Sequence, residues 1–318
     1  MTALNLLGAN IAQQVPYSTA GHSDVRVVLD CLNRAWGTEL ILNMTRHTAR
    51  DQDLVRLANS WGVIQLYYIA YGATQALIAA EGRRRPTTHP GTQEQVATLW
   101  VERSFAVAPW SFAMGHPGGR GLGADGSANG PKRQLLEVHP WTPCDASNSW
   151  DIAALALRTT REHHVSARLE RLRAERAAQA RKTWRQEEAE RLRQNKRPRV
   201  ERQWPTRARL KRSESDEAAA KVRPHTMVDY FYRLRVKANY EDARMFTEGP
   251  ESEGQSRQVA RDIAHLASAT MLSHEIRVGR LLGRQVLGQA VDTWLKDNTR
   301  PDEEHGLALR RDMLHKYL

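Results

Sequence analysis

Cysteine, lysine and long apolar runs are all scarce in this chain. Its 318 residues include two cysteines, Cys31 and Cys144, which excludes a disulfide framework and a cysteine-based metal site. No run of about 18 apolar residues occurs, and the N-terminal residues lack the basic start and apolar core of a signal peptide. We therefore predict no membrane span and expect a reducing, cytoplasmic compartment.

Strand signals are also nearly absent, because no alternating run of β-branched residues exceeds four. Apolar residues instead recur at helical spacing. The helices expected from this spacing cover 24–46, 52–81, 91–104, 226–246 and 256–297, with a short amphipathic helix over 302–316. The fold class predicted is all-α, a helical bundle interrupted by a Gly-rich loop and a long basic helical arm.

Local signals indicate where two of these helices begin or end. Asp24 is a plausible N-cap for the first of them, and Gly82 is expected to end the second. In the second helix an apolar stripe is expected to face the core. Its members are Leu54, Leu57, Trp61, Ile64, Tyr68 and Tyr71.

Composition divides the chain into four parts. Residues 1–105 and 223–318 have the patterning of the two halves of one bundle. Residues 106–150 include the stretch GHPGGRGLGADGSANGP and are expected to form a Gly/Pro-rich loop insert. Residues 151–222 are expected to form a basic charged helix, over 151–196, followed by a basic linker.

The positive charge is concentrated in one segment. The chain carries a net charge of +11, and residues 158–212 hold 19 Lys and Arg against 7 Asp and Glu, so the rest is almost neutral. Arg binds phosphate bidentately and Trp stacks on unpaired bases, so this segment is a candidate for nucleic-acid contact. The residues chosen are Arg168, Arg171, Arg181, Lys182, Arg185, Arg197, Arg199, Arg209, Lys211, Arg212, Trp184 and Trp204. The alternative is a solvated helix whose Glu residues partly neutralise it.

Two segments carry a resemblance to a known family. These are Tyr67–His89 (YYIAYGATQALIAAEGRRRPTTH) and Tyr232–Phe246 (YRLRVKANYEDARMF). The first is similar to the tyrosine-rich second helix and TH turn of the HEPN superfamily of helical bundles, and the second to that family's closing segment. The resemblance implies a bundle with a large insertion, in a family of metal-independent ribonucleases, toxins, antiviral defence components and silent RNA-binding members.

The same resemblance implies where a site would lie. Active members carry an Arg, then four to six residues and a His, usually at a dimer interface. The matching stretch here runs from Arg235 to Tyr240, with Tyr240 in place of the His and Val236 in place of a polar neighbour. Tyr has a reference pKa near ~10 and is a poor general base at pH 7. Arg235, Tyr240 and Asn239 are the candidate catalytic residues, and His89 is a candidate helper.

Metal and cofactor signals are missing. His163 and His164 have no carboxylate or thiolate partner at ligand spacing beyond Glu162, and His274–Glu275 lacks the second His of a zinc motif. We therefore predict no metal and no cofactor.

Two functions remain open from the sequence. One is an RNA-binding or RNA-cleaving protein of a bacterial defence or toxin–antitoxin system, for which the resemblance implies a homodimer. The other is a non-enzymatic scaffold that docks on a partner protein or nucleoprotein through the basic arm. A DNA-reading helix-turn-helix is not found.

Overall fold

The computed structural model describes residues 2–18, 24–103, 107, 109–115, 149–200, 207–241, 252–298 and 306–318. These residues form ten α-helices and two short π-helical segments, with a single isolated bridge and no strand among them. The all-α prediction is confirmed. Most of the loop predicted over 106–150 lies outside the described residues.

The chain divides into two compact units, which are described separately. The first comprises Met1–Leu157 and His225–Leu318, and the second comprises Arg158–Pro224. The helices of the first unit are α1 (Thr2–Gln14), α2 (Val25–Thr48), α3 (Gln52–Ala80), α4 (His89–Val96), α8 (Met227–Val236), α10 (Glu253–Leu282), α11 (Arg284–Asn298) and α12 (Leu307–Tyr317), with π-helical segments η1 (Ala97–Val101) and η2 (Lys237–Glu241). The start of α6 (Ser149–Arg193) belongs to the first unit, and its remainder and α7 (Arg212–Ala220) belong to the second.

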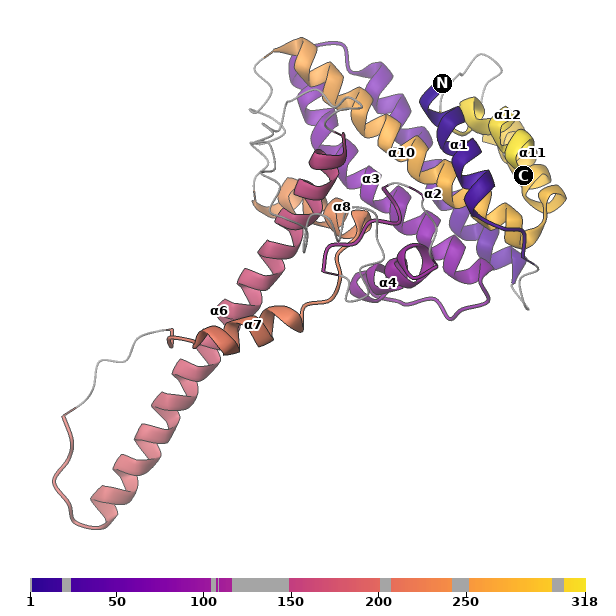
Figure 1. Ribbon diagram of the computed structural model, residues 1–318. Coiled ribbons are helices and arrows are strands. Elements are labelled where there is room, and N and C mark those ends of the chain that lie inside the picture. Colours follow the sequence, from indigo (N-terminus) through magenta and orange to yellow (C-terminus); the bar gives the residue numbers. More distant parts are fainter. Residues whose placement is uncertain are drawn as a thin grey trace. The chain divides into compact units, whose positions relative to one another are not determined.

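Three long helices, α2, α3 and α10, pack side by side at the centre of the first unit (Figure 1). Asp24 caps α2 by accepting hydrogen bonds from two backbone amides, as predicted, and Asp51 caps α3 by accepting one from the amide of Leu54. The core is apolar and aromatic, with Trp36, Trp100 and Trp110 almost completely buried. Burial of this apolar surface is the main force that holds the helices together.

Two of the predicted helices are shorter than expected. The helix predicted over 256–297 is broken at Gly283, which has φ +98 and separates α10 from α11. A residue with a Cβ rarely adopts that conformation, so glycine allows the chain to turn here. The helix predicted over 226–246 keeps α-helical geometry to Val236 and continues as η2 to Glu241, and residues 242–246 lie outside the described residues. Part of the stretch predicted as linker, Arg212–Ala220, is the helix α7.

The apolar stripe expected to face the core along α3 is only partly buried. Leu54, Leu57, Trp61 and Tyr68 are exposed, with Trp61 at 57%. The buried face of α3 lies one position away and uses Val55, Asn59, Val63 and Ala70 among others. The prediction is confirmed for Ile64 and wrong for the four exposed positions, because small and polar residues, including alanine and asparagine, fill the tight contacts with α2 and α10.

One described helix, α3, is long and apolar enough to cross a membrane by length and composition alone. Its most apolar window is 78% buried within the first unit, as in the core helix of many bundles.

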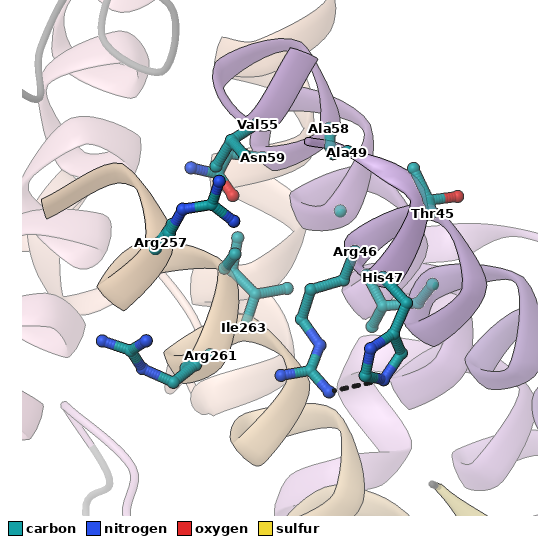
Figure 2. Close-up of a pocket in the computed structure, with 13 residues that line it drawn as sticks. Thr45, Arg46, His47, Ala49, Val55, Ala58, Asn59, Arg257, Arg261 and Ile263 are labelled. Atoms are coloured by element: carbon teal, nitrogen blue, oxygen red, sulfur yellow. Dashed lines mark hydrogen bonds between the residues drawn. The ribbon is translucent and has the colours of Figure 1, made fainter. Parts of the chain in front are cut away.

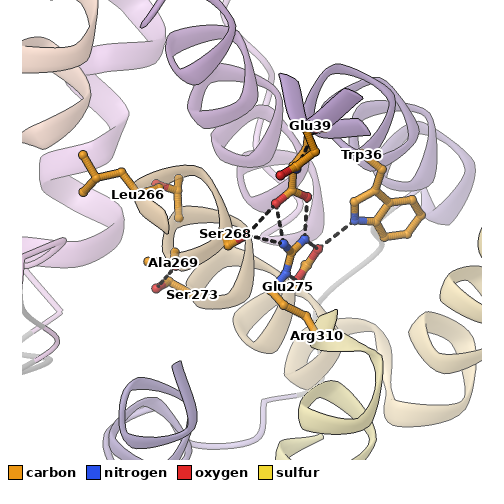
Figure 3. Close-up of polar contacts among 10 residues, drawn as sticks. Trp36, Glu39, Leu266, Ser268, Ala269, Ser273, Glu275 and Arg310 are labelled. Atoms are coloured by element: carbon orange, nitrogen blue, oxygen red, sulfur yellow. Dashed lines mark hydrogen bonds and ion pairs between the residues drawn. The ribbon is translucent and has the colours of Figure 1, made fainter. Parts of the chain in front are cut away.

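A buried ion-pair network fixes α12 to α2 and α10 (Figure 3). The guanidinium of Arg310 donates hydrogen bonds to Glu39 on α2 and to Glu275 on α10, and all three side chains are at most 1% exposed. Trp36 Nε1 donates to Glu275 at 2.7 Å, and Ser268 Oγ donates to Glu39 at 2.9 Å. Burial alone would lower the pKa of Arg310, but the two carboxylates outweigh it and raise the pKa.

Candidate functional site

A cluster of aromatic rings lies where α3, α4 and α8 meet in the first unit. Tyr67 and Tyr71 come from α3, His89 begins α4, and Tyr232 comes from α8. The ring of Tyr67 lies 5.3 Å from that of Tyr232 and 5.4 Å from that of His89, both edge-on. Tyr68 joins the cluster and is 40% exposed, so the cluster reaches the surface.

Arg235 on α8 places its guanidinium over this cluster. Its Cζ lies 5.2–5.6 Å from the ring centroids of three tyrosines, Tyr67, Tyr68 and Tyr232. Cation–π attraction holds a guanidinium in such a position without neutralising it. Arg235 has no carboxylate partner within the described ranges, and its Nε is buried there without a hydrogen bond. The charge is therefore available to a ligand.

His89 is joined to the cluster by a short hydrogen bond. The Tyr67 hydroxyl lies 2.7 Å from Nδ1 of His89, and no other partner of that buried hydroxyl is found in the described part of the chain. A buried hydroxyl is satisfied only if it donates, so we assign its proton to the bond with Nδ1. Neutral His89 then carries its own proton on Nε2.

Electrostatics agree with this assignment. Burial, and secondly the charge of Arg235, lower the pKa of His89, so the imidazole is neutral at pH 7. Burial raises the pKa of Tyr67, so its phenol stays protonated and remains a donor to Nδ1. The half-buried His89 thus presents an N–H at Nε2, while Arg235 presents its guanidinium N–H groups to the same cluster.

An anion is the group that this arrangement suits chemically. Two kinds of N–H donor meet at a partly exposed aromatic surface, and the described part of the cluster contains no carboxylate. A neutral imidazole whose Nδ1 already accepts a hydrogen bond has no free lone pair with which to take a proton. The geometry therefore favours holding a phosphate over general-base chemistry at His89.

The other residues predicted at this site are placed differently. Asn239 lies in η2 and is exposed. The backbone of Tyr240 is also in η2, but its side chain lies outside the described residues. π-Helical segments often occur at functional sites, and η2 follows directly after the helix that carries Arg235.

The placement of Arg235 and His89 at one aromatic cluster was not predicted. His89 was expected as a helper, and it is half-buried and follows Thr88, which caps α4. Helical spacing offered one signal, since Tyr232 and Arg235 are three residues apart on α8 and share a face.

The second unit has one covered and one exposed face along α6. Positions 169, 173, 177, 180, 184, 188 and 191, at spacings of three and four, are buried or half-buried. The chain returns along this face, where the amide of Ala208 donates to the carbonyl of Arg173 at 3.0 Å and that of Arg199 donates to Glu188 at 2.7 Å. Arg161 on α6 also donates to the carbonyl of Ala219 at the end of α7.

Several cations of the second unit are neutralised within it. Among the candidates for nucleic-acid contact, Arg199 pairs with Glu187 and Glu188, and Arg212 pairs with Asp216. Further pairs join Arg173 and Arg207 to Glu170, and Arg176 to Glu214. Ion pairs of this exposed kind contribute little stability, but they do reduce the charge offered to a polyanion.

A line of exposed cations without ion pairs runs along the other face of α6. Arg168, Arg171, Lys182 and Arg185 are all exposed and form no ion pair within the described ranges. They are separated by three, eleven and three residues, which keeps them on one face of the helix. Glu175 lies between them on this face, and Arg168 and Arg171 also line a pocket with Glu214 and Glu217 of α7. The line spans about 26 Å of helix at 1.5 Å per residue. Arg181, half-buried, and Arg197 and Arg209 are likewise without ion pairs in that part of the chain.

Three further residues were predicted to contact nucleic acid, namely Lys211, Trp184 and Trp204. The backbone amide of Lys211 donates to Glu214 at the start of α7. Trp184 is half-buried on the covered face of α6, so its ring is not placed among the exposed cations. Trp204 lies outside the described residues.

Within the part of the chain that the structure describes, no three His, Cys, Asp or Glu side chains are grouped to hold a metal ion. The rings of His163 and His164 lie edge to face, 5.8 Å apart, on α6.

Comparison with known proteins adds no relative. No protein-family model, no curated protein and no solved structure matches this chain.

Proposed function

We propose that the chain is an RNA-binding, HEPN-like helical protein of a bacterial defence or toxin–antitoxin system. The observation that carries this proposal is the line of exposed cations on α6, Arg168, Arg171, Lys182 and Arg185, without ion pairs among the described residues. Such a line offers positive charge along one helical face to a sugar–phosphate backbone, and each contact with a phosphate releases a bound counterion.

Binding through this line is not expected to depend strongly on base sequence. Guanidinium groups on an exposed helical face reach phosphate oxygens, whereas the ring of Trp184 is half-buried on the opposite face. The preference for RNA over DNA rests on the resemblance of 67–89 and 232–246 to the family's segments. The cluster of Arg235 and His89 would supply a second phosphate contact on the first unit.

Cleavage of RNA is a second candidate function, favoured by the presence of Arg235 and His89 in one cluster. Arg235 would hold the scissile phosphate and stabilise its developing charge. His89 would first have to exchange its tautomer or become protonated, because its neutral form has the proton on Nε2. This requirement makes binding the function that the geometry supports better.

One experiment separates the two functions. The purified chain is titrated into a labelled single-stranded RNA, and into DNA of the same sequence, at several salt concentrations with and without EDTA. We expect salt-sensitive binding, with the RNA intact after incubation. Cleavage that is insensitive to EDTA and lost in both Arg235→Ala and His89→Ala would establish the second function instead. Absence of binding to either nucleic acid at low salt would refute the proposal.

A further inference from the structure

A pocket of about 250 Å³ in the first unit has no part in the functions described above. It lies between the end of α2, the start of α3 and the first half of α10 (Figure 2). Three arginines and a histidine line it, namely Arg46 and His47 from α2 and Arg257 and Arg261 from α10. It shares no residue with the cluster of Arg235 and His89.

One of these arginines is already neutralised. Arg257 pairs with Glu253 at 2.7 Å on the same helix, and its Nη2 donates to the backbone carbonyl of Arg50, also at 2.7 Å. The second contact ties the turn between α2 and α3 to α10. Arg257 therefore has a structural role that accounts for its charge.

The other two arginines have no such explanation. Arg261 bonds only to the amide oxygen of Gln258, through Nε and Nη2 at 3.2 and 2.7 Å. Arg46 lies 3.2 Å from Nε2 of His47, and its own Nε is buried without a partner in the described residues. Neither has a carboxylate within the described ranges, since the nearby Asp262 accepts from Gln258 instead.

The two guanidinium groups disfavour one another. Burial, and secondly the charge of Arg261, lower the pKa of Arg46. Arg46 is half-buried and Arg261 is exposed, so solvent screens part of the repulsion, but a like charge beside a half-buried guanidinium still costs free energy unless an anion offsets it. The strain of this arrangement would be relieved by a bound ligand.

We propose that this pocket binds the phosphate group of a small organic phosphate, with Arg46 and Arg261 as its cationic ligands. A phosphate monoester carries about −1.5 to −2 charge at pH 7, which matches two uncompensated guanidinium groups. Leu42, Val55 and Ile263 line the same pocket and offer an apolar surface to the remainder of the molecule. The volume is below the ~300–1,000 Å³ usual for drug-sized ligands, so a compact molecule is expected.

The test is calorimetric titration of the full chain with inorganic phosphate, AMP, adenosine and acetate as probes. Variants Arg46→Gln and Arg261→Gln each remove one cation, and Arg26→Gln, an exposed arginine of α2 outside the pocket, is the matched control. We expect AMP and phosphate to compete for one site and to bind at least tenfold more weakly in R46Q and R261Q, with R26Q unchanged. Acetate and adenosine are expected to bind at least tenfold more weakly than AMP.

Thermal unfolding shows whether a variant that no longer binds the ligand is still folded. Without ligand, R46Q should unfold at the same temperature as the unsubstituted chain or higher, because like-charge repulsion is removed. With AMP, the unfolding temperature should rise in the unsubstituted chain and in R26Q but not in R46Q. No saturable binding of phosphate or AMP, equal binding of acetate, or equal affinity in R46Q would overturn the proposal. Loss of RNA binding in R46Q would do so too, by making the pocket part of a polymer-binding surface.

Discussion

The hydroxyl of Tyr67 lies 2.7 Å from Nδ1 of His89, and this bond determines what His89 can do. A phenol that donates to Nδ1 fixes the imidazole as the tautomer protonated on Nε2. Nitrogen-15 spectra of the His89 ring at pH 7 should show a protonated Nε2 and an unprotonated Nδ1. A proton on Nδ1 would contradict the assignment and return His89 to the role of a base.

Tyr67→Phe should separate the packing of this residue from its hydrogen bond. The ring stays, so the edge-on contacts with His89 and Tyr232 are kept while the hydroxyl is removed. We expect a decrease of about 1 kcal/mol in the free energy of unfolding, measured in urea, because a buried imidazole nitrogen loses its donor. The ring of His89 should then populate both tautomers. An unchanged tautomer would show that Tyr67 does not control it.

Arg235→Ala should raise the pKa of His89, because the charge of Arg235 is one of the two factors that lower it. Burial, the larger factor, remains, so the pKa should stay below its ordinary value of about 6.5. An NMR titration of the His89 ring follows this directly, and Arg235→Lys, which keeps the charge, is the control. The same Ala variant should weaken RNA binding. An identical His89 titration in all three proteins would contradict the proximity of the two residues.

We predict that the free energy of unfolding decreases in acid because of His274. Burial, and secondly the charge of Arg277, lower its pKa to about 4, although its bond to the carbonyl of Thr270 raises the pKa. Above pH 6.5 the residue is neutral in both states and contributes no pH dependence. Between about 6.5 and 4 only the unfolded chain binds the proton, so stability falls as pH falls, by up to about 3 kcal/mol below pH 4.

Urea unfolding across this pH range measures the effect of His274. His274→Gln cannot take up a proton and should flatten that part of the pH dependence. His265→Gln, which replaces an exposed histidine of the same helix, is the matched control and should leave it in place. An equal slope in H274Q and in the unsubstituted chain would assign the acid sensitivity to other groups.

Arg310→Met should be strongly destabilising, because it leaves Glu39 and Glu275 buried without a cation. Breaking a buried ion pair from one side costs about 3–5 kcal/mol. Adding Glu39→Gln and Glu275→Gln to Arg310→Met should recover a large part of that stability, since no buried charge then remains. Denaturant unfolding compares the single and triple variants. A triple variant no more stable than the single one would contradict this explanation.

The sequence predicted the helices better than the contacts between them. Helical spacing placed 52–81 within one residue of α3, and the capping role of Asp24 follows from its side chain alone. The break at Gly283 was missed because apolar spacing continues across it and one glycine does not distinguish a turn from a tolerated helical position. Arg235 on α8 and His89 on α4 both contact the ring of Tyr67, and no local rule relates residues so far apart in the sequence.

The buried face of α3 was also not predicted from helical spacing. Leu54, Leu57 and Trp61 have the spacing of a buried face, yet the packing of α3 against α2 and α10 uses alanine and asparagine. Close helix packing favours small residues, and hydrophobicity alone does not show which face is packed. For the basic arm, charge counting found the right segment, whereas the division into paired and unpaired cations depends on where the chain returns along α6.

The salt dependence of RNA binding tests the central claim most directly. Replacing Lys182 and Arg185 by Gln removes two exposed cations that have no ion pair in the described part of the chain, whereas Arg26→Gln with Arg34→Gln removes the same charge from the exposed face of α2. The first pair should reduce the slope of log K against log salt by about 1.4, because each phosphate of single-stranded RNA that is no longer neutralised lowers the slope by about 0.7. The control pair should leave the slope nearly unchanged. Equal slopes in both double variants and the unsubstituted chain would show that α6 does not hold the RNA backbone.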